Sequence, residues 1–181
     1  MKTCDHKSVG VIIINQAGRF LLLTRAKPPA GRAPVAGHVD EHGDFEQAGI
    51  VESMEEVGLH VDHLTHLAQG HLPNICRRPP SHATHDGHDW VIYRTYVRDE
   101  FGLAFSEDET RGGRWYGADE LQELAERTIL WATGEVSDAD YNENPGLEPV
   151  WVYWMAEVGH IHVNRRDLAA VAKIYSQAPA A

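Results

Sequence analysis

Residues 37–59 read GHVDEHGDFEQAGIVESMEEVGL and combine a loop that contains glycine with one well-delimited helix. Asp44, followed by Gln47 three residues later, has the pattern of a capping box, and an acidic residue suits the N-terminal end of a helix dipole. Gly58 stands where a left-handed C-terminal cap is expected. The stretch therefore predicts a helix that begins at about Asp44 and ends at Gly58.

The two faces of this helix differ in chemistry. At 100° per residue, three apolar residues share one stripe, which we expect to be buried: Ile50, Met54 and Val57. Three carboxylates fall in an arc on the opposite side: Glu52, Glu55 and Glu56. The pattern predicts a helix that buries one face and gathers acidic groups on the other.

The gathered carboxylates favour a metal site. Each pair of like charges about 4 Å apart costs on the order of 1 kcal/mol in water and more near a protein surface. A hard divalent cation turns that repulsion into attraction, and ligands that are all oxygen suit Mg²⁺ or Mn²⁺. The alternative interpretation is a solvated acidic helix face without a ligand.

The same stretch resembles the signature box of the Nudix hydrolases. That box reads Gly, five residues, Glu, seven residues, Arg-Glu, an apolar residue, one residue, Glu-Glu, one residue, Gly and an apolar residue. Six positions match in register: Gly37, Glu52, Glu55, Glu56, Gly58 and Leu59. The motif is long and strictly spaced, so the match is specific.

Three positions depart from the family pattern. Gly43 stands where the first Glu belongs, Val51 where the Arg belongs, and Ser53 where an apolar residue is usual. Asp44, one residue after Gly43, is a candidate for the missing carboxylate. The family's Arg braces a catalytic glutamate through a bidentate ion pair, which valine cannot do. Either another cation replaces it, or the site is looser and slower, or hydrolysis has been lost.

The resemblance implies roles for the box residues. Glu52 and Glu56 would be the principal metal ligands, and Glu55 would be a third ligand or would orient the attacking water. The backbone carbonyl of Gly37 would complete the metal site. A further acid from a later loop often acts as base or ligand in this family, and Glu109 is the candidate here. A solvated loop carboxylate is the alternative for Glu109.

Arginines near the box are candidates for binding substrate phosphates. Arg25 ends the second expected strand, and Arg32 lies in the loop that follows. Arg77 and Arg78 form a second basic pair further along the chain. Ordinary surface arginines are the alternative interpretation for all of these residues.

Length and composition bound the class of protein. The 181 residues suffice for one domain with its own core, and the apolar fraction of 43% is ordinary for a soluble globular protein. A net charge of −11 argues against binding to a nucleic-acid polymer. No apolar run approaches the roughly 20 residues that span a membrane, and residues 9–14 are too short for a signal-peptide core. We therefore expect a cytoplasmic protein that acts on a small phosphorylated substrate.

The order of the elements predicts an α/β Nudix fold, with a mixed β-sheet sandwiched between helices. Strands are expected at residues 8–15, 19–24, 61–70, 90–97 and 113–116. Besides the box helix, an amphipathic helix is expected at residues 119–132. We expect a Nudix domain over residues 1–132 and a helical C-terminal extension over residues 133–181 that packs on it.

The expected extension contains helices and a group of aromatic residues. Helices are expected at residues 148–157 and 164–175, with one helical turn at residues 137–141. Trp151, Tyr153 and Trp154 are expected to pack on the domain or on a second subunit, so a homodimer stays open. Stacking on bases is the alternative for these aromatic residues.

The two cysteines lie near histidines, which raises the question of zinc. Cys4 and His6 precede the first expected strand, and Cys76 shares a loop with three histidines: His82, His85 and His88. Two thiolates and two imidazoles satisfy tetrahedral zinc. A structural zinc ion held by Cys4, His6, Cys76 and one of the three loop histidines is one hypothesis. A buried cysteine and solvated histidines are the other.

Three functions fit the sequence. The first is a metal-dependent hydrolase, a Nudix-type pyrophosphohydrolase, that cleaves a diphosphate linkage in a nucleoside diphosphate derivative or a related metabolite. The second is a ligand-binding module of Nudix fold without catalysis, which the departures at Gly43 and Val51 support. The third is an enzyme similar to isopentenyl-diphosphate isomerase, but Ala36 stands where the nucleophilic cysteine of that enzyme would be.

Overall fold

A long buried strand, β1, lies at the centre of the sheet in the computed structural model, which describes residues 2–81, 86–98 and 102–177. Within these ranges, seven strands form the sheet. They are β1 (Lys7–Asn15), β2 (Phe20–Arg25), β3 (Arg32–Ala33), β4 (Val35–His38), β5 (Thr65–Leu72), β6 (His88–Val97) and β7 (Thr110–Tyr116). The helices are α1 (Phe45–Val57), α2 (Ala118–Ala132), α3 (Asp138–Glu143), α4 (Pro149–Glu157) and α5 (Arg165–Tyr175).

β1 pairs with different strands along its two edges. Its whole length pairs in parallel with β6, from Lys7 opposite Asp89 to Asn15 opposite Val97. On the other edge, its first half pairs antiparallel with β4, and its last residues pair with β2. The sheet is therefore mixed, as expected, and β4 delivers the chain directly to the loop before α1.

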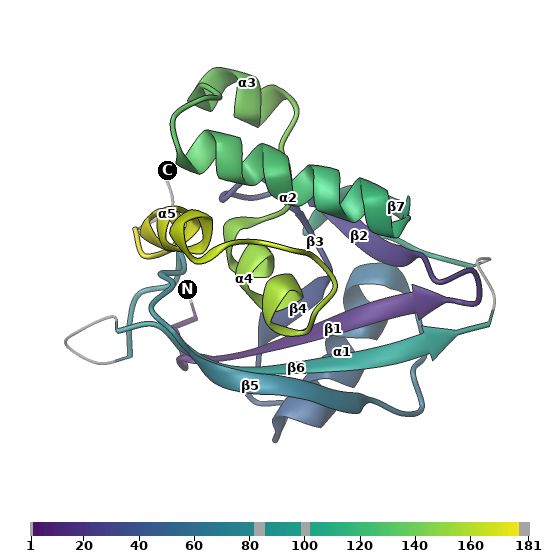
Figure 1. The fold of residues 1–181 in the computed structure, drawn as a ribbon. Helices are drawn as coiled ribbons and strands as arrows, with labels where there is room; N and C mark the ends of the chain where they lie inside the picture. The colour runs from purple at the N-terminus through teal and green to yellow at the C-terminus, as the bar shows by residue number, and fades with distance from the viewer. Residues whose placement is uncertain (1, 82–85, 99–101, 178–181) are drawn as a thin grey trace.

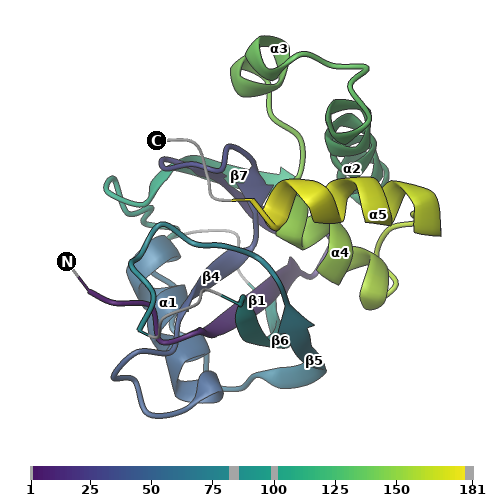
Figure 2. The same ribbon diagram turned by 90° about the vertical axis from the view of Figure 1, so that its left-hand side faces the viewer.

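Side chains of β1 alternate between two cores, because successive residues of a strand point to opposite faces. Val11 and Ile13 pack with the residues beneath α1, whereas Ile12 and Ile14 pack with α4. Figure 2 shows the resulting three layers, with α1 on one face of the sheet and α2, α4 and α5 on the other. The predicted sandwich of a mixed sheet between helices is confirmed.

The expected ends of α1 are confirmed. The Asp44 carboxylate accepts a hydrogen bond from the Gln47 amide at 2.8 Å, and Gly58 adopts a left-handed conformation with φ 69°. A side chain at Gly58 would be strained in that conformation. Local sequence therefore sets both ends of the helix.

The predicted buried face of α1 is only partly correct, because Val57 is buried and Ile50 packs against the same core, but Met54 is not buried. Met54 is 46% exposed, and the buried residues include Gly49, Ser53 and Glu56 instead. The buried Ser53 hydroxyl donates to the Gly49 carbonyl at 2.8 Å, so it costs no unsatisfied polar group. The helix turns this face inward because Gly49 has no side chain and allows α1 to lie close to Val9 and Val11 of β1.

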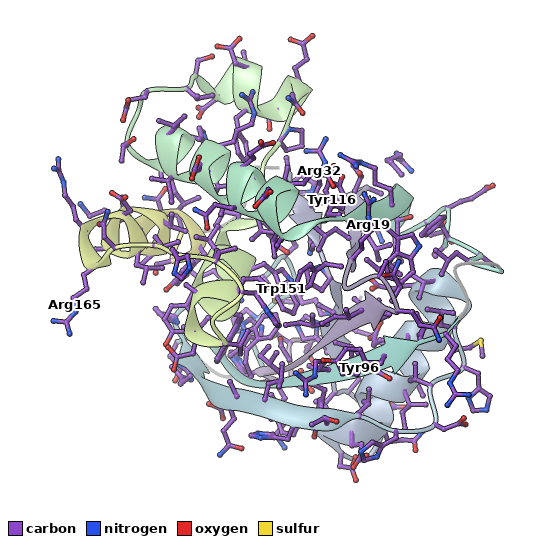
Figure 3. The ribbon with its side chains drawn as sticks, turned by 45° about the vertical axis from the view of Figure 1, so that its right-hand side comes forward. Arg19, Arg32, Tyr96, Tyr116, Trp151 and Arg165 are labelled. Atoms are coloured by element: carbon purple, nitrogen blue, oxygen red, sulfur yellow. The ribbon has the colours of Figure 1, made fainter. Side chains whose placement is uncertain are left out.

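The C-terminal helices contribute to the main core. Trp151 and Trp154 of α4 are buried and belong to the same apolar cluster as Ile12 and Ile92 of the sheet. Figure 1 shows α4 lying over the sheet, and Figure 3 shows Trp151 between α4 and the strands. These two residues pack on the domain, as expected, and their burial leaves no surface for stacking on bases.

In the ranges given above, no helix combines the length and the apolar character that crossing a bilayer requires.

We predict that Gly10→Ala destabilises the protein. An added Cβ at Gly10 would overlap the Trp151 ring, and overpacking of this kind costs about 1–3 kcal/mol. Gly70→Ala is the matched control, since its added Cβ would meet only Trp154, at 3.6 Å. Denaturant unfolding measures both variants, and equal stabilities for the two would contradict the close packing of α4 on β1.

Candidate functional site

The box glutamates of α1 meet the backbone of β4. Glu52 lies so close to Gly37 that a Cβ at position 37 would overlap its carboxylate. One turn later, the Glu56 carboxylate accepts a hydrogen bond from the Ala36 amide at 3.2 Å. Glycine at position 37 is therefore required by the approach of a carboxylate, and the predicted grouping of Gly37 with Glu52 and Glu56 is present.

Burial and mutual repulsion make two of these glutamates resist ionisation. Burial, and then the charges of Glu55 and Glu109, raise the pKa of Glu52 to about 7. Burial and the charge of Glu52 raise the pKa of Glu56 well above its usual range, although the Ala36 amide and Arg25 oppose the shift. A cation that binds between these carboxylates would stabilise their charged forms and so lower the free energy of the site.

The donors fit Mg²⁺ or Mn²⁺ better than a softer metal. The carboxylates and the Gly37 carbonyl offer only oxygen atoms, and Glu55 is exposed beside them. Mg²⁺ keeps several waters and needs only one or two carboxylates, so it does not require a tight cage.

Glu109 lies at the same site, although it is far from α1 in sequence. Its charge contributes to the raised pKa of both Glu52 and Glu56. Its carboxylate also pairs with the Lys27 ammonium at 3.3 Å, and both side chains are exposed. Lys27 was not among the predicted site residues, because a lysine in a Pro/Gly loop carries no specific signal.

Arg25 and Arg32 both contact the segment before α4. Arg25 pairs with the buried Glu148 at 3.2 Å, and its charge also lowers the pKa of Glu56. Arg32 donates to the Asn144 side chain at 3.3 Å, while its Nη1 is buried with no hydrogen-bond partner in the described structure. Figure 3 shows Arg32 on the side of the sheet that faces α2. Sequence reasoning missed Glu148 and Asn144, which become neighbours of β2 and β3 only through the fold.

The departures from the box have distinct structural settings. Val51 is half-buried and lines a groove with Ile50, Met54, Glu55 and His60. Val51 therefore lies next to Glu55. Its apolar side chain cannot brace a carboxylate.

At the other two departures, the structure supplies a local reason. Gly43 has φ 96°, a conformation that favours glycine over glutamate. The Asp44 carboxylate, proposed above as a substitute for that glutamate, is exposed and caps the helix. Ser53 satisfies its hydroxyl within α1.

A second cluster of side chains that are candidate metal ligands lies at the end of β4. In the part of the chain that the structure describes, one set of two cysteines and two histidines brings its donor atoms within 4.8 Å of one another: Cys4, His38, Cys76 and His88. Three of these were predicted, but His38 takes the place of His6. The His6 ring instead contacts the Gly87 carbonyl at 2.9 Å. His82 and His85 lie outside the described residues.

Burial shifts the pKa values of two residues of this cluster, Cys4 and His38. It raises the pKa of the Cys4 thiol to about 12, opposed by the hydrogen bond from the His6 amide. Burial and the neighbouring Arg78 lower the pKa of His38 to about 4. His38 is therefore neutral at pH 7 and keeps a lone pair on its ring.

Comparisons with known proteins agree on the fold. A family model described as NUDIX domain matches residues 5–134. Comparison with curated proteins finds no match. Among solved structures, an Ap4A hydrolase of C. elegans in a binary complex has 24% identity over 66% of this chain and 85% of its own, with a TM-score of 0.52.

Two further structures are similar to the same extent. The dihydroneopterin triphosphate pyrophosphohydrolase of E. coli has 24% identity, with 66% of this chain and 85% of its own covered and a TM-score of 0.52. The MutT protein of Methanosarcina mazei Go1 has 18% identity, with 68% and 84% covered and a TM-score of 0.52. At these identities the likeness establishes the fold alone.

We predict that stability without added Mg²⁺ or Mn²⁺ falls as the pH rises. Because the pKa of Glu52 is raised to about 7 from 4.5, the folded state binds more protons than the unfolded state between these values. In Glu52→Gln the fall should be smaller by up to about 3 kcal/mol, since one pKa unit corresponds to about 1.4 kcal/mol.

Denaturant unfolding between pH of about 5 and 8 measures this difference. Glu46→Gln, an exposed change on the same helix, should keep the native pH dependence. Identical pH profiles for the native protein and Glu52→Gln would show that Glu52 ionises freely in the folded state.

Proposed function

The chain belongs to the Nudix family, and from that premise we propose that it is a metal-dependent hydrolase. Its substrate would be a nucleoside diphosphate derivative or a related metabolite, cleaved at a diphosphate linkage. One observation carries the proposal: Glu52 and Glu56 are held against the backbone of residues 36–37 although both resist ionisation there. Such an arrangement costs free energy in the protein alone, and a bound cation would recover it.

The proposed ligands of the divalent cation are the Gly37 carbonyl and the carboxylates of Glu52, Glu55 and Glu56. A bound Mg²⁺ or Mn²⁺ neutralises charge on phosphoryl oxygens and lowers the pKa of bound water. Ala36 supports this assignment, because its amide fixes one oxygen of Glu56 and leaves the other available. The acidic net charge of −11 is compatible with an anionic substrate when metal supplies the local positive charge.

The protein's own groups would handle the water and the phosphates. Water attacks one phosphorus, its proton passes to a carboxylate, and the bond from that phosphorus to the bridging oxygen breaks. Glu55 or Glu109 is the proposed acceptor, because both are exposed next to the buried ligands. Arg25 and Arg32 are proposed to contact substrate phosphates. Lys27, which pairs with Glu109, is a further cation available to them.

A ligand-binding module without catalysis is the second candidate. Val51 favours it, because no arginine at this position braces the glutamates. A panel of dinucleotides, nucleotide sugars, nucleoside triphosphates and pterin triphosphates, incubated with Mg²⁺, separates the two candidates. Product formation supports the hydrolase, whereas tight binding without products supports the module.

We predict that Glu52→Gln and Glu56→Gln each lower turnover at least about 100-fold, the scale of losing a key electrostatic group. Both changes keep the size of the side chain and remove a charge that is costly in the folded protein. Glu46→Gln, on the exposed first turn of α1, is the control and should keep native turnover. Full activity in both variants, or in excess chelator, would rule out the proposed mechanism.

We further predict that the native enzyme needs more Mg²⁺ than its relatives, or prefers Mn²⁺, and turns over slowly. Val51→Arg should lower the half-saturating Mg²⁺ concentration by about 10-fold, the lower range for support of a metal ligand. Position 51 lies one helical turn before Glu55, which the arginine fork can bind. Val51→Lys is the matched control and should act less, since an ammonium cannot pair in bidentate fashion. Saturation of the native enzyme at low micromolar Mg²⁺ would mean that another residue already fills this role.

A further inference from the structure

Four segments of the chain meet at one group of sulfur and nitrogen atoms, of which Cys4 and His88 are buried and His38 and Cys76 half-buried. Cys4 precedes β1, His38 ends β4, Cys76 lies between β5 and β6, and His88 begins β6. We propose that Cys4, His38, Cys76 and His88 hold one structural Zn²⁺ ion. This site is separate from the glutamates of α1 and does not depend on the proposed hydrolase activity.

The spacing of the donor atoms fits a tetrahedron. Cys4 Sγ lies 3.1 Å from His88 Nε2 and 3.6 Å from His38 Nε2. All four donors lie within 4.8 Å of one another. Zinc bonds of about 2.0–2.3 Å to nitrogen and sulfur require ligand atoms about 3.3–3.8 Å apart, so small shifts bring these donors onto one ion.

The surrounding hydrogen bonds orient the ligands. His88 Nδ1 lies 2.9 Å from the Asn74 carbonyl, which can only accept, so Nδ1 carries the proton and the lone pair of Nε2 points at Cys4. The Asn74 side chain is fixed in turn by the Trp90 indole at 2.9 Å. The His6 amide donates to Cys4 Sγ at 3.3 Å, as amides do to thiolates that bind metal. His6 therefore supports the site through its backbone.

Charge and burial favour a bound zinc ion over the same four side chains without an ion. Two thiolates and two neutral imidazoles balance the charge of Zn²⁺, and Cys4 and His88 are both fully buried. Arg78, whose charge acts on His38, is itself neutralised by donating to both oxygens of Asp40, at 2.7 and 2.9 Å. A neutral metal site is the arrangement that such a buried location tolerates best.

The ion would tie an irregular segment to the sheet. Residues 73–80 belong to none of the sheet's strands, and Cys4 meets them through a parallel bridge with Pro80 and a hydrogen bond from its amide to the Pro79 carbonyl at 2.8 Å. Zinc would add a cross-link from this segment to β4, β6 and the N-terminal segment. One of its ligands, His38, directly follows Gly37.

The test is metal content of protein without a histidine tag, purified after growth with zinc. We expect about one equivalent of zinc, and less than about a tenth in Cys76→Ser and in His38→Asn, since each removes one ligand. His6→Asn is the matched control, because asparagine tolerates the left-handed conformation of His6, φ 59°. It should keep zinc, which distinguishes His38 from His6 as the ligand.

A second measurement does not depend on the stability of the variants. Native protein stripped of zinc and reloaded with Co²⁺ should show the thiolate charge-transfer and d–d absorption bands of a tetrahedral site. Both thiols should react with a thiol reagent only after the metal is removed. Less than about a tenth of an equivalent of zinc in the native protein, iron in its place, or a Cys4–Cys76 disulfide in freshly purified protein would each overturn the proposal.

Discussion

The close approach of α1 to β1 and β4 is the constraint on which the site depends. Gly49 allows the helix to lie close to β1, and Gly37 leaves room for the Glu52 carboxylate at the end of β4. A methyl group at either position would push the helix outward. The carboxylates would then move away from the backbone that orients them, and water would reach their buried oxygens. The glycines at positions 37 and 49 therefore determine how strongly the glutamates are desolvated.

β4 places two different sets of candidate metal ligands at adjacent residues, Gly37 and His38. Gly37 faces the oxygen donors of α1, whereas His38 belongs to the cluster of sulfur and nitrogen donors. Hard ions such as Mg²⁺ prefer the first set, and zinc prefers the second. Adjacent residues of a strand point to opposite faces, so the alternation of the strand itself keeps the two sets apart.

Features set by local sequence were predicted well. The caps at Asp44 and Gly58 depend only on neighbouring residues, and the ends of α1 follow from them. The buried face of α1 was predicted only in part, because Val57 is buried as expected but hydrophobicity also favoured Met54, although the sheet requires the small residues Gly49 and Ser53. A search for small residues at helical spacing would have found that face.

Features that depend on long-range contacts could not be predicted. His38 joins Cys4 and His88 only because β4 and β6 flank the same strand, β1. Spacing along the sequence favoured His6, which is nearer to Cys4. In the same way, the partner of Arg25 is Glu148, from a segment that returns after α2 and α3.

The burial of α4 against β1 has a consequence for biosynthesis. Ile12, Ile14 and the ring of Trp90 would face solvent on a nascent chain until Trp151 emerges from the ribosome. An exposed apolar face of this kind attracts chaperones and neighbouring nascent chains. Translation that stalls after α2 would therefore release a polypeptide with all seven described strands but without α4 and α5 to cover them, a natural substrate for quality-control proteases.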